Sequence, residues 1–224
     1  MVDIKEKKEK TKNWWKKNLA NLVTVAGVIS AFLFLETVIL EPKSVKKQII
    51  YALITAITDF IDGKIAKDTN TTTVFGSYID RIRDRIFVYP GIIILGWQHK
   101  EKIVFQELLV CLMASLFFFE VLIFRIGAVG YYWYRRGKNI DLQSSYFGKK
   151  KMFTGFSVIL IWLFSLHLES QGIALLRYSI WLIYLGLLLM IYWSYVSWKE
   201  YAQREIELRK ADSENKNPSK NKAR

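Results

Sequence analysis

The feature that most constrains this chain is a series of apolar runs, each long enough to contribute to a membrane span. A helix needs about 20 mostly apolar residues to cross the hydrocarbon core of a bilayer, and a soluble domain needs no such repetition. Runs this long are typical of helices, which satisfy their own backbone polar groups in lipid. We therefore predict an all-α integral membrane protein with six transmembrane helices. The expected spans are residues 19–40, 48–66, 86–97 (continuing a helix that begins upstream), 103–124, 152–168 and 174–196.

The distribution of basic residues predicts the orientation. Of the 33 Lys and Arg, 27 fall in segments on one side of the membrane. Cytoplasmic loops carry an excess of Lys and Arg, so this side is expected to be the cytoplasm, with both termini there. The remaining six are expected outside: Lys43, Lys46, Lys47, Lys100, Lys102 and Arg177.

The two ends of the chain differ from the middle. Residues 1–18, MVDIKEKKEKTKNWWKKN, are basic with paired tryptophans, which predicts an amphipathic juxtamembrane helix on the anionic inner leaflet. A solvated tail that only fixes the topology is the alternative. Residues 199–224 are expected to form a charged, disordered cytoplasmic tail, since the sequence from Lys210 onward lacks an apolar period. The net charge of +13 is assigned to topology and to attraction of anionic lipid and nucleotide substrates, without a nucleic-acid partner.

Four aspartates interrupt this apolar pattern at the cytoplasmic ends of the second and third runs. Asp59 and Asp62 are three residues apart, so they share one face of a helix. Asp80 and Asp84 are four apart and share a face of the next helix. The connector KDTNTTTV is short and polar, which predicts two antiparallel helices. Both acidic faces should then lie at the same level of the membrane.

Four carboxylates at one level require a counter-charge. An unpaired Asp in the membrane core costs about 2.5–3.5 kcal/mol, and several together also repel one another. Partial pairing with Lys64, Lys67, Arg81 or Arg85 is one solution. Oxygen ligands at these spacings suit one or two Mg²⁺ or Mn²⁺ ions better, and such ions could hold a pyrophosphate. The acids therefore predict phosphoryl-transfer chemistry.

Three small residues accompany the aspartates. Gly63 directly follows the second acid, Ala66 lies three residues further on, and Gly76 lies four residues before Asp80. Small residues let helix backbones approach closely in a membrane, which is their simplest interpretation. They could also admit a flat base beside the acids.

Taken together, these residues resemble the signature of the CDP-alcohol phosphatidyltransferases, D-x-x-D-G-x-x-A-R-x8-G-x3-D-x3-D. The resemblance implies a six-helix domain over residues 19–198, acting as a homodimer with its active site at the cytoplasmic face. It also implies that CDP-diacylglycerol gives its phosphatidyl group to an alcohol and releases CMP. The chain reads Asp59-x-x-Asp62-Gly63-x-x-Ala66-Lys67-x8-Gly76-x3-Asp80-x3-Asp84, with lysine at residue 67 as the one departure.

The resemblance also implies roles for these residues. Asp84 would be the general base that takes the proton of the acceptor hydroxyl. Lys67 would contact the donor phosphates, although a lysine lacks the bidentate fork of an arginine. The implied ligands of two Mg²⁺ or Mn²⁺ ions are Asp59, Asp62, Asp80 and Asp84. The implied CDP-binding set is Asp59, Asp62, Gly63, Ala66, Lys67, Gly76 and Asp80.

The segment that opens the fifth run suggests the acceptor. SYFGKKKMFTG resembles the S-x-x-G-K-x-K-T segment of phosphatidylglycerophosphate synthases, with Met152 in place of the threonine. This favours glycerol 3-phosphate, whose phosphate would contact Arg125, Lys149 and Lys151. Basic residues in this loop are also expected from topology alone.

Three further candidates leave the acceptor open. Asn21 and Thr24 resemble part of the synthase segment P-N-x-L-T-x-x-R, but Gly27 stands where that segment has arginine. Arg85, directly after the last aspartate, is closer to the inositol-phosphate branch. Inositol phosphate or another polar alcohol is therefore the alternative acceptor.

Other acids within the apolar runs favour a different class of protein. Glu36, Glu107 and Glu120 fall inside expected spans, and membrane acids also mark ion paths. A divalent-cation transporter is thus the remote alternative, although it predicts acids spread through the membrane depth. We expect Glu120 to pair with Arg125. The single cysteine, Cys111, is expected to be a small packing residue.

Overall fold

The computed structural model describes residues 22–68, 74–102, 105–135, 146–173 and 175–216, and this part of the chain is helical apart from its turns. The predicted juxtamembrane helix at residues 1–18 lies outside the described residues. The helices are an N-terminal helix over Leu22–Leu40, α2 (Val45–Asp68), α3 (Val74–Gln98), the 3-10 turn η1 (Lys100–Lys102), α4 (Gln106–Arg135), α5 (Tyr146–Glu169) and α6 (Leu176–Lys216).

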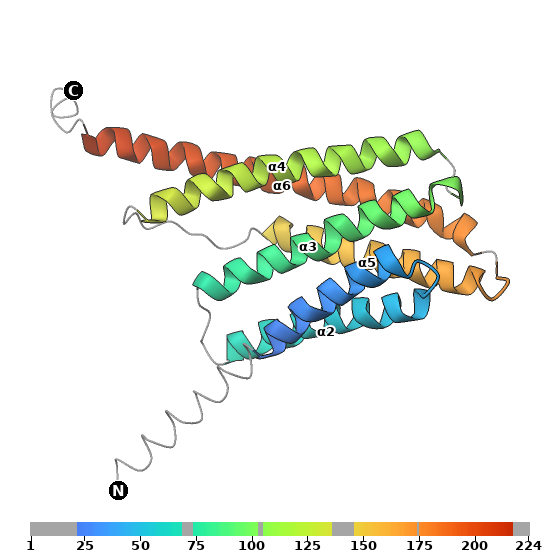
Figure 1. Cartoon of the computed structure of the whole chain (residues 1–224). Coiled ribbons are helices and arrows are strands. Elements are labelled where there is room, and N and C mark those ends of the chain that lie inside the picture. Colours follow the sequence, from blue (N-terminus) through green and yellow to red (C-terminus); the bar gives the residue numbers. More distant parts are fainter. Residues whose placement is uncertain (1–21, 69–73, 103–104, 136–145, 174, 217–224) are drawn as a thin grey trace, which may run out of the picture.

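The long helices run up and down along a common direction (Figure 1). At one end of the bundle lie the C-terminal ends of α2, α4 and α6 and the start of α3. At the other end lie the turn after Leu40, η1 and the turn after α5. We call these the motif end and the far end. Helix α5 packs against α2, α3 and α6, which makes it the central element.

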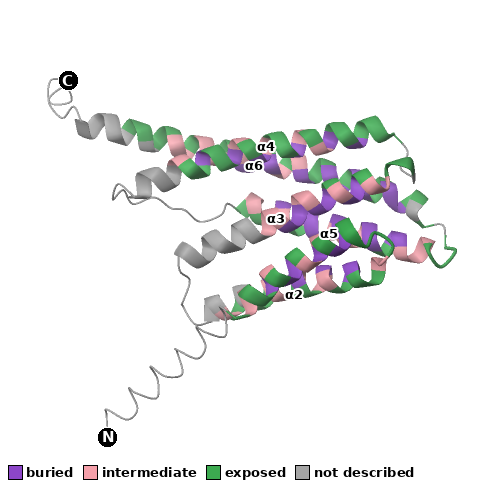
Figure 2. Ribbon diagram, in the orientation of Figure 1, coloured by how far each residue is buried: buried purple, intermediate pink, exposed green. Residues whose placement is uncertain are grey.

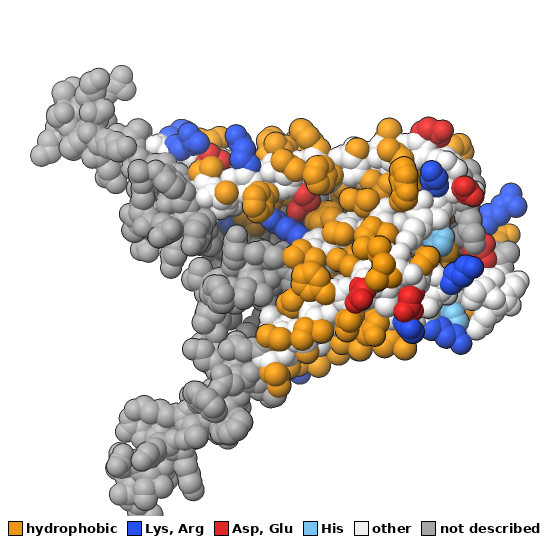
Figure 3. All heavy atoms as spheres, viewed as in Figure 1, with side chains coloured by type: hydrophobic (Ala, Val, Ile, Leu, Met, Phe, Trp, Pro, Cys, Tyr) orange, Lys and Arg blue, Asp and Glu red, His pale blue; other side chains and the backbone are white. Residues whose placement is uncertain are grey.

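The outer surface of the bundle is apolar. Phe60, Phe153 and Tyr178 are each at least 73% exposed, and the face in view carries many apolar side chains along the middle of the bundle (Figure 3). A water-soluble protein rarely exposes so much contiguous apolar surface, so this is a lipid-facing surface. The chain is thus an integral membrane protein.

Among the described residues, four helices are long and apolar enough to cross a membrane. They are Leu22–Leu40, Gln106–Val129, Tyr146–Glu169 and Arg177–Glu207. The two remaining expected spans correspond to α2 and α3, whose composition includes the motif aspartates and neighbouring basic residues. Helical structure is thus confirmed for all six expected segments within the described chain, and span-like composition for four of them.

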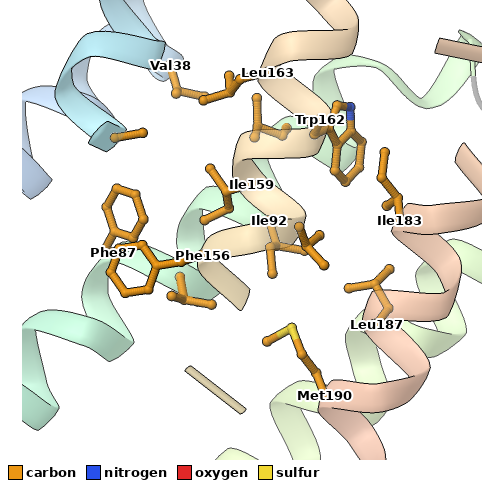
Figure 4. Packing of buried hydrophobic residues seen from close by; sticks show 14 of the residues in the cluster. Val38, Phe87, Ile92, Phe156, Ile159, Trp162, Leu163, Ile183, Leu187 and Met190 are labelled. Carbon is orange, nitrogen blue, oxygen red and sulfur yellow. The ribbon is translucent and has the colours of Figure 1, made fainter. Parts of the chain in front are cut away.

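The apolar core surrounds α5. Buried positions recur along α5 (Figure 2). Trp162 and Ile159 of this helix are fully buried, and their side chains lie toward residues of α3 and α6 (Figure 4). The ring of Phe87 lies 4.7 Å from that of Phe34 and 4.7 Å from that of Phe156, as measured between centroids. This aromatic row ties the N-terminal helix, α3 and α5 together.

Two glycines allow the close approach of helices to α5. A Cβ atom on Gly155 would overlap the side chain of Val88 on α3. A Cβ atom on Gly186, which lies on α6, would overlap Val158 on α5. Both contacts match the use of small residues at membrane helix interfaces. The position of α3 relative to α5 therefore depends on Gly155.

Glutamine side chains join the helices at the far end. The last carbonyls of a helix have no partner within it. Gln98 on α3 donates from Nε2 to the Val38 carbonyl at 2.6 Å, and Gln48 on α2 donates to the Glu41 carbonyl at 3.1 Å. These amides cap the N-terminal helix and its following turn.

Two expectations differ from the structure. Helix α6 continues to Lys216, so the tail predicted to be disordered from residue 199 is helical over most of its length. Its charged residues are good helix formers, and Arg209 pairs with Glu205 one turn earlier at 2.6 Å. Cys111 is exposed rather than packed, because it lies off the buried stripe that runs through Leu109 and Leu112.

Candidate functional site

The four motif aspartates lie on helices at the motif end. Asp59 and Asp62 belong to the last turns of α2, and Asp80 and Asp84 to the first turns of α3. Both segments are helical, and residues three or four apart on a helix share one face. The acid-bearing ends of α2 and α3 lie at the same end of the bundle (Figure 1).

Only part of this motif has described side chains. Asp59 and Asp84 are half-buried. The side chains of Asp62, Gly63, Ala66, Lys67, Gly76 and Asp80 lie outside the described set, so the predicted convergence of the four acids remains a prediction. Among the side chains that are described, no group of three His, Cys, Asp or Glu could hold a metal ion. The motif itself offers oxygen donors only, which fits a hard divalent cation.

A charged cluster lies close to Asp84. Glu120 on α4 is 8% exposed, and Lys151 on α5 is 3% exposed. The Lys151 ammonium donates a hydrogen bond to Glu120 Oε1. The other carboxylate oxygen, Oε2, is 3.3 Å from Nε of Arg85 on α3. This Glu120 cluster, formed by Glu120, Lys151 and Arg85, connects three helices.

Helical periodicity explains why these charged residues meet. Glu120 continues the buried stripe of α4 through Leu112 and Leu116, at spacings of four. Lys151 continues the buried stripe of α5 through Gly155 and Val158. Polar residues at such positions face the core as their apolar neighbours do. This periodicity was the signal in the sequence that could have identified the cluster.

The expected pairing of Glu120 with Arg125 is wrong. Arg125 is exposed on α4. Five residues along an α-helix turn the side chain by about 140°, so Arg125 faces away from Glu120. Lys151 and Arg85 take its place as partners.

The three consecutive lysines at the start of α5 face different environments. Lys149 is exposed and Lys151 is buried in the Glu120 cluster. Between them, the Lys150 ammonium lies 4.6 Å from the ring centroid of Tyr146 and 4.9 Å from that of Trp193. An open pocket on the exposed side of α5 is lined by Lys149, Lys150, Phe153, Thr154 and Trp193. The structure thus separates Lys149 from Lys151, which were expected to serve one phosphate.

The remaining candidates are scattered. Arg125 is exposed on α4, and Thr24 is half-buried in the N-terminal helix. Asn21 lies outside the described residues. Arg85 is half-buried in the Glu120 cluster, where sequence reasoning had not placed it.

Comparison with known proteins identifies the family. The family model described as CDP-alcohol phosphatidyltransferase matches residues 17–192, which is most of the chain. A CDP-diacylglycerol--glycerol-3-phosphate 3-phosphatidyltransferase from Wigglesworthia glossinidia brevipalpis is 28% identical over 153 residues, covering 66% of this chain and 76% of the relative. No solved structure matches the chain. The membrane helices, the aspartate motif and the family match together show that this chain belongs to the CDP-alcohol phosphatidyltransferase family.

Proposed function

We propose that this transferase moves the phosphatidyl group of CDP-diacylglycerol to glycerol 3-phosphate and releases CMP. The observation that carries the proposal is the complete D-x-x-D and D-x3-D spacing on helix ends at the same end of the bundle. The relative from Wigglesworthia supports the choice of acceptor, because its name specifies glycerol 3-phosphate. The basic start of α5 is consistent with an anionic acceptor at this end.

In the proposed reaction, the acceptor hydroxyl oxygen attacks the phosphorus that carries diacylglycerol. A bond forms between that oxygen and phosphorus, and the bond to the bridging oxygen breaks, so that CMP leaves. Asp84 takes the hydroxyl proton as general base. Its half-buried position on α3 leaves it partly accessible.

The oxygen-only donor set fits a divalent metal, and the family is generally metal dependent. Asp59, Asp62, Asp80 and Asp84 would hold Mg²⁺ or Mn²⁺. Bound there, a pair of such ions would neutralise the donor pyrophosphate and the charge that develops on it. Gly63, Ala66 and Gly76 would leave room for the cytidine, and Lys67 would contact a donor phosphate.

The acceptor phosphate would bind near the exposed start of α5. Lys149 is the best-supported contact, since its ammonium is not buried. Lys151 and Arg85 are less well suited to a direct contact, because both pair with Glu120. The ion pair of Arg85 with Glu120 also disfavours a direct contact of this arginine with an inositol phosphate.

The proposal includes an arrangement in the membrane. All six helices would cross the bilayer, with the motif end and both termini in the cytoplasm, as the basic residues indicate. A homodimer is the expected assembly. Cysteine labelling of intact cells would test the orientation: a reporter at Lys100 should react with an impermeant reagent, and one at Lys199 should not. The reverse result would overturn the orientation.

An acceptor assay tests the function. Purified protein is given CDP-diacylglycerol and Mg²⁺ or Mn²⁺, and CMP release is followed with glycerol 3-phosphate, inositol phosphate, inositol or serine in separate reactions. Glycerol 3-phosphate should give the highest kcat/KM. Release with inositol phosphate alone would overturn the acceptor but keep the reaction class. No CMP with any acceptor would overturn the proposal.

A further inference from the structure

The Glu120 cluster places three charged side chains within the helical bundle. Glu120 is buried on α4, Lys151 is buried on α5, and Arg85 is half-buried on α3. With one carboxylate and two cations, the cluster carries a net positive charge. A buried ion pair often adds little stability compared with apolar side chains of similar size. Stability alone is therefore a weak reason for this arrangement.

The position of Arg85 suggests a more specific role. Arg85 directly follows Asp84, so a contact that fixes Arg85 also fixes the rotation of α3 at Asp84. Glu120 supplies this contact from α4, with Oε2 3.3 Å from Arg85 Nε. One turn further along α3, the ring of Tyr89 lies 5.8 Å from the Lys151 ammonium. Two successive turns of α3 thus contact the cluster.

Tight packing around these two turns of α3 means that a change at Arg85 alters the rotation of the whole start of the helix. Val88 lies against Gly155 with no room for a side chain at residue 155, and Phe87 is stacked on Phe156. Closely packed helices shift as rigid units, so a change at Arg85 should move the start of α3 as a whole. A misplacement of about 1 Å can reduce a reaction rate about 100-fold.

We propose that Glu120 is a positioning residue for the transferase reaction. By holding Arg85 and Lys151, its carboxylate fixes the rotation of α3 and so sets the Asp84 carboxylate against the acceptor hydroxyl. This inference rests on the proposed function, because it assumes that Asp84 is the base. It assigns no substrate contact to Glu120 itself.

Two variants separate positioning from a purely structural role. Glu120→Gln keeps the shape of the side chain but leaves Lys151 and Arg85 without a carboxylate. The double variant Glu120→Gln/Lys151→Met also removes the buried lysine charge, so that only Arg85 loses its partner. The double variant should recover the thermal stability lost in the single variant, since no buried ammonium is left unpaired.

The experiment measures kcat, the KM for glycerol 3-phosphate and the Tm in detergent for both variants. We expect kcat to fall about 10- to 100-fold in both, with the acceptor KM within about threefold of the wild type. Glu120→Asp, which keeps the charge, should regain part of kcat. Gln98→Leu is the matched control: it removes a polar contact at the far end of the same helix and should lower Tm without lowering kcat.

Each outcome decides the proposal. A double variant that regains wild-type kcat together with its Tm would overturn the positioning role, and so would an unchanged kcat in Glu120→Gln. A rise in acceptor KM with unchanged kcat would instead assign the cluster to phosphate binding and would also overturn it. If the wild type releases no CMP, the proposed function fails and the positioning role fails with it. Wild-type turnover with unaffected variants would overturn the positioning role alone.

Discussion

The two ends of the bundle use polar side chains in different ways. At the far end, Gln48 and Gln98 donate hydrogen bonds to backbone carbonyls. Tyr184 on α6 does the same, donating to the Phe105 carbonyl at 2.9 Å. At the motif end, the buried Glu120 and Lys151 are charged, and they pair with each other and with Arg85 in the Glu120 cluster.

This difference indicates that the polar groups at the far end stabilise the bundle, and that those at the motif end serve the reaction. Neutral amides and hydroxyls that satisfy helix ends hold the helices together at low electrostatic cost. Charged groups within a membrane protein are costly and usually mark a functional site. We therefore expect substitutions at the motif end to change activity more than stability, and substitutions at the far end to do the reverse.

The largest expected effect is the loss of the proposed base. Asp84→Asn should lower kcat about 100- to 10,000-fold, because the amide cannot accept the hydroxyl proton. Binding of CDP in the presence of Mn²⁺, measured by calorimetry, should be largely retained, because Asp59, Asp62 and Asp80 would still hold the metal. The control is Asp68→Asn, an acid outside the motif on α2. Turnover close to the wild-type rate in Asp84→Asn would remove the base assignment.

The opposite result is expected at the far end. Gln98→Leu removes the hydrogen bond to the Val38 carbonyl and should lower the free energy of unfolding by about 1–3 kcal/mol. The kcat of the folded protein should not change. Thermal unfolding in detergent, with the exposed Gln106→Leu as control, measures the first effect. A loss of kcat without a loss of stability would contradict the division between the two ends.

A smaller effect is expected at Lys67, where the chain departs from the family motif. Lys67→Arg restores a bidentate donor for phosphate and should lower the KM for CDP-diacylglycerol about two- to tenfold. Lys67→Met should raise it. Lys64→Met, one turn away and exposed, is the control. An unchanged donor KM in Lys67→Met would exclude a phosphate contact by this residue.

The smallest effect is expected for the exposed ion pair at the far end. The hydrogen bond from Lys47 to Glu41, with 2.7 Å between Nζ and Oε2, lowers the pKa of Glu41 below its usual 4.5. A carboxyl with a lowered pKa stabilises the fold above its unfolded-state pKa, and this contribution is lost as the pH falls through the folded-state value.

Between about pH 7 and pH 3, the Tm of the wild type should therefore fall slightly more than that of Glu41→Gln. Glu101→Gln, another exposed acid near the far end, is the control. Because both side chains of the pair are exposed to solvent, added salt should make the difference between wild type and Glu41→Gln smaller. A pH dependence in Glu41→Gln that is steeper than in the wild type would contradict the sign of this effect.

The sequence predicted the helices well because membrane helices must satisfy their own backbone. The sequence predicted the ends of the helices less well. An apolar run marks the part of a helix that lies in lipid, but the helix can continue beyond that part. Helix α4 continues through Gly127 to Arg135, and α6 continues to Lys216, because helical hydrogen bonding does not end at the membrane surface.

The aspartate motif is read directly from the sequence, whereas the Glu120 cluster was not predicted from it. Within each pair, the motif aspartates are only three or four residues apart, and residues at these spacings share one face of a helix. The cluster joins residues 31 apart in α4 and α5 and brings in Arg85 from α3, which depends on how helices pack. Lys149 and Lys151 look equivalent in the sequence, yet helical rotation exposes one and buries the other.

The most direct test of the account is metal binding at the motif end. Mn²⁺ is titrated by electron paramagnetic resonance into the wild type with CDP, into a variant with asparagine at residues 59, 62, 80 and 84, and into Glu36→Gln/Glu107→Gln, which removes acids toward the far end. The wild type and the Glu36/Glu107 variant should bind Mn²⁺ equally, and the four-asparagine variant should bind none above background while keeping its Tm. Undiminished Mn²⁺ binding by a folded four-asparagine variant would contradict the assignment of the aspartates to a metal site.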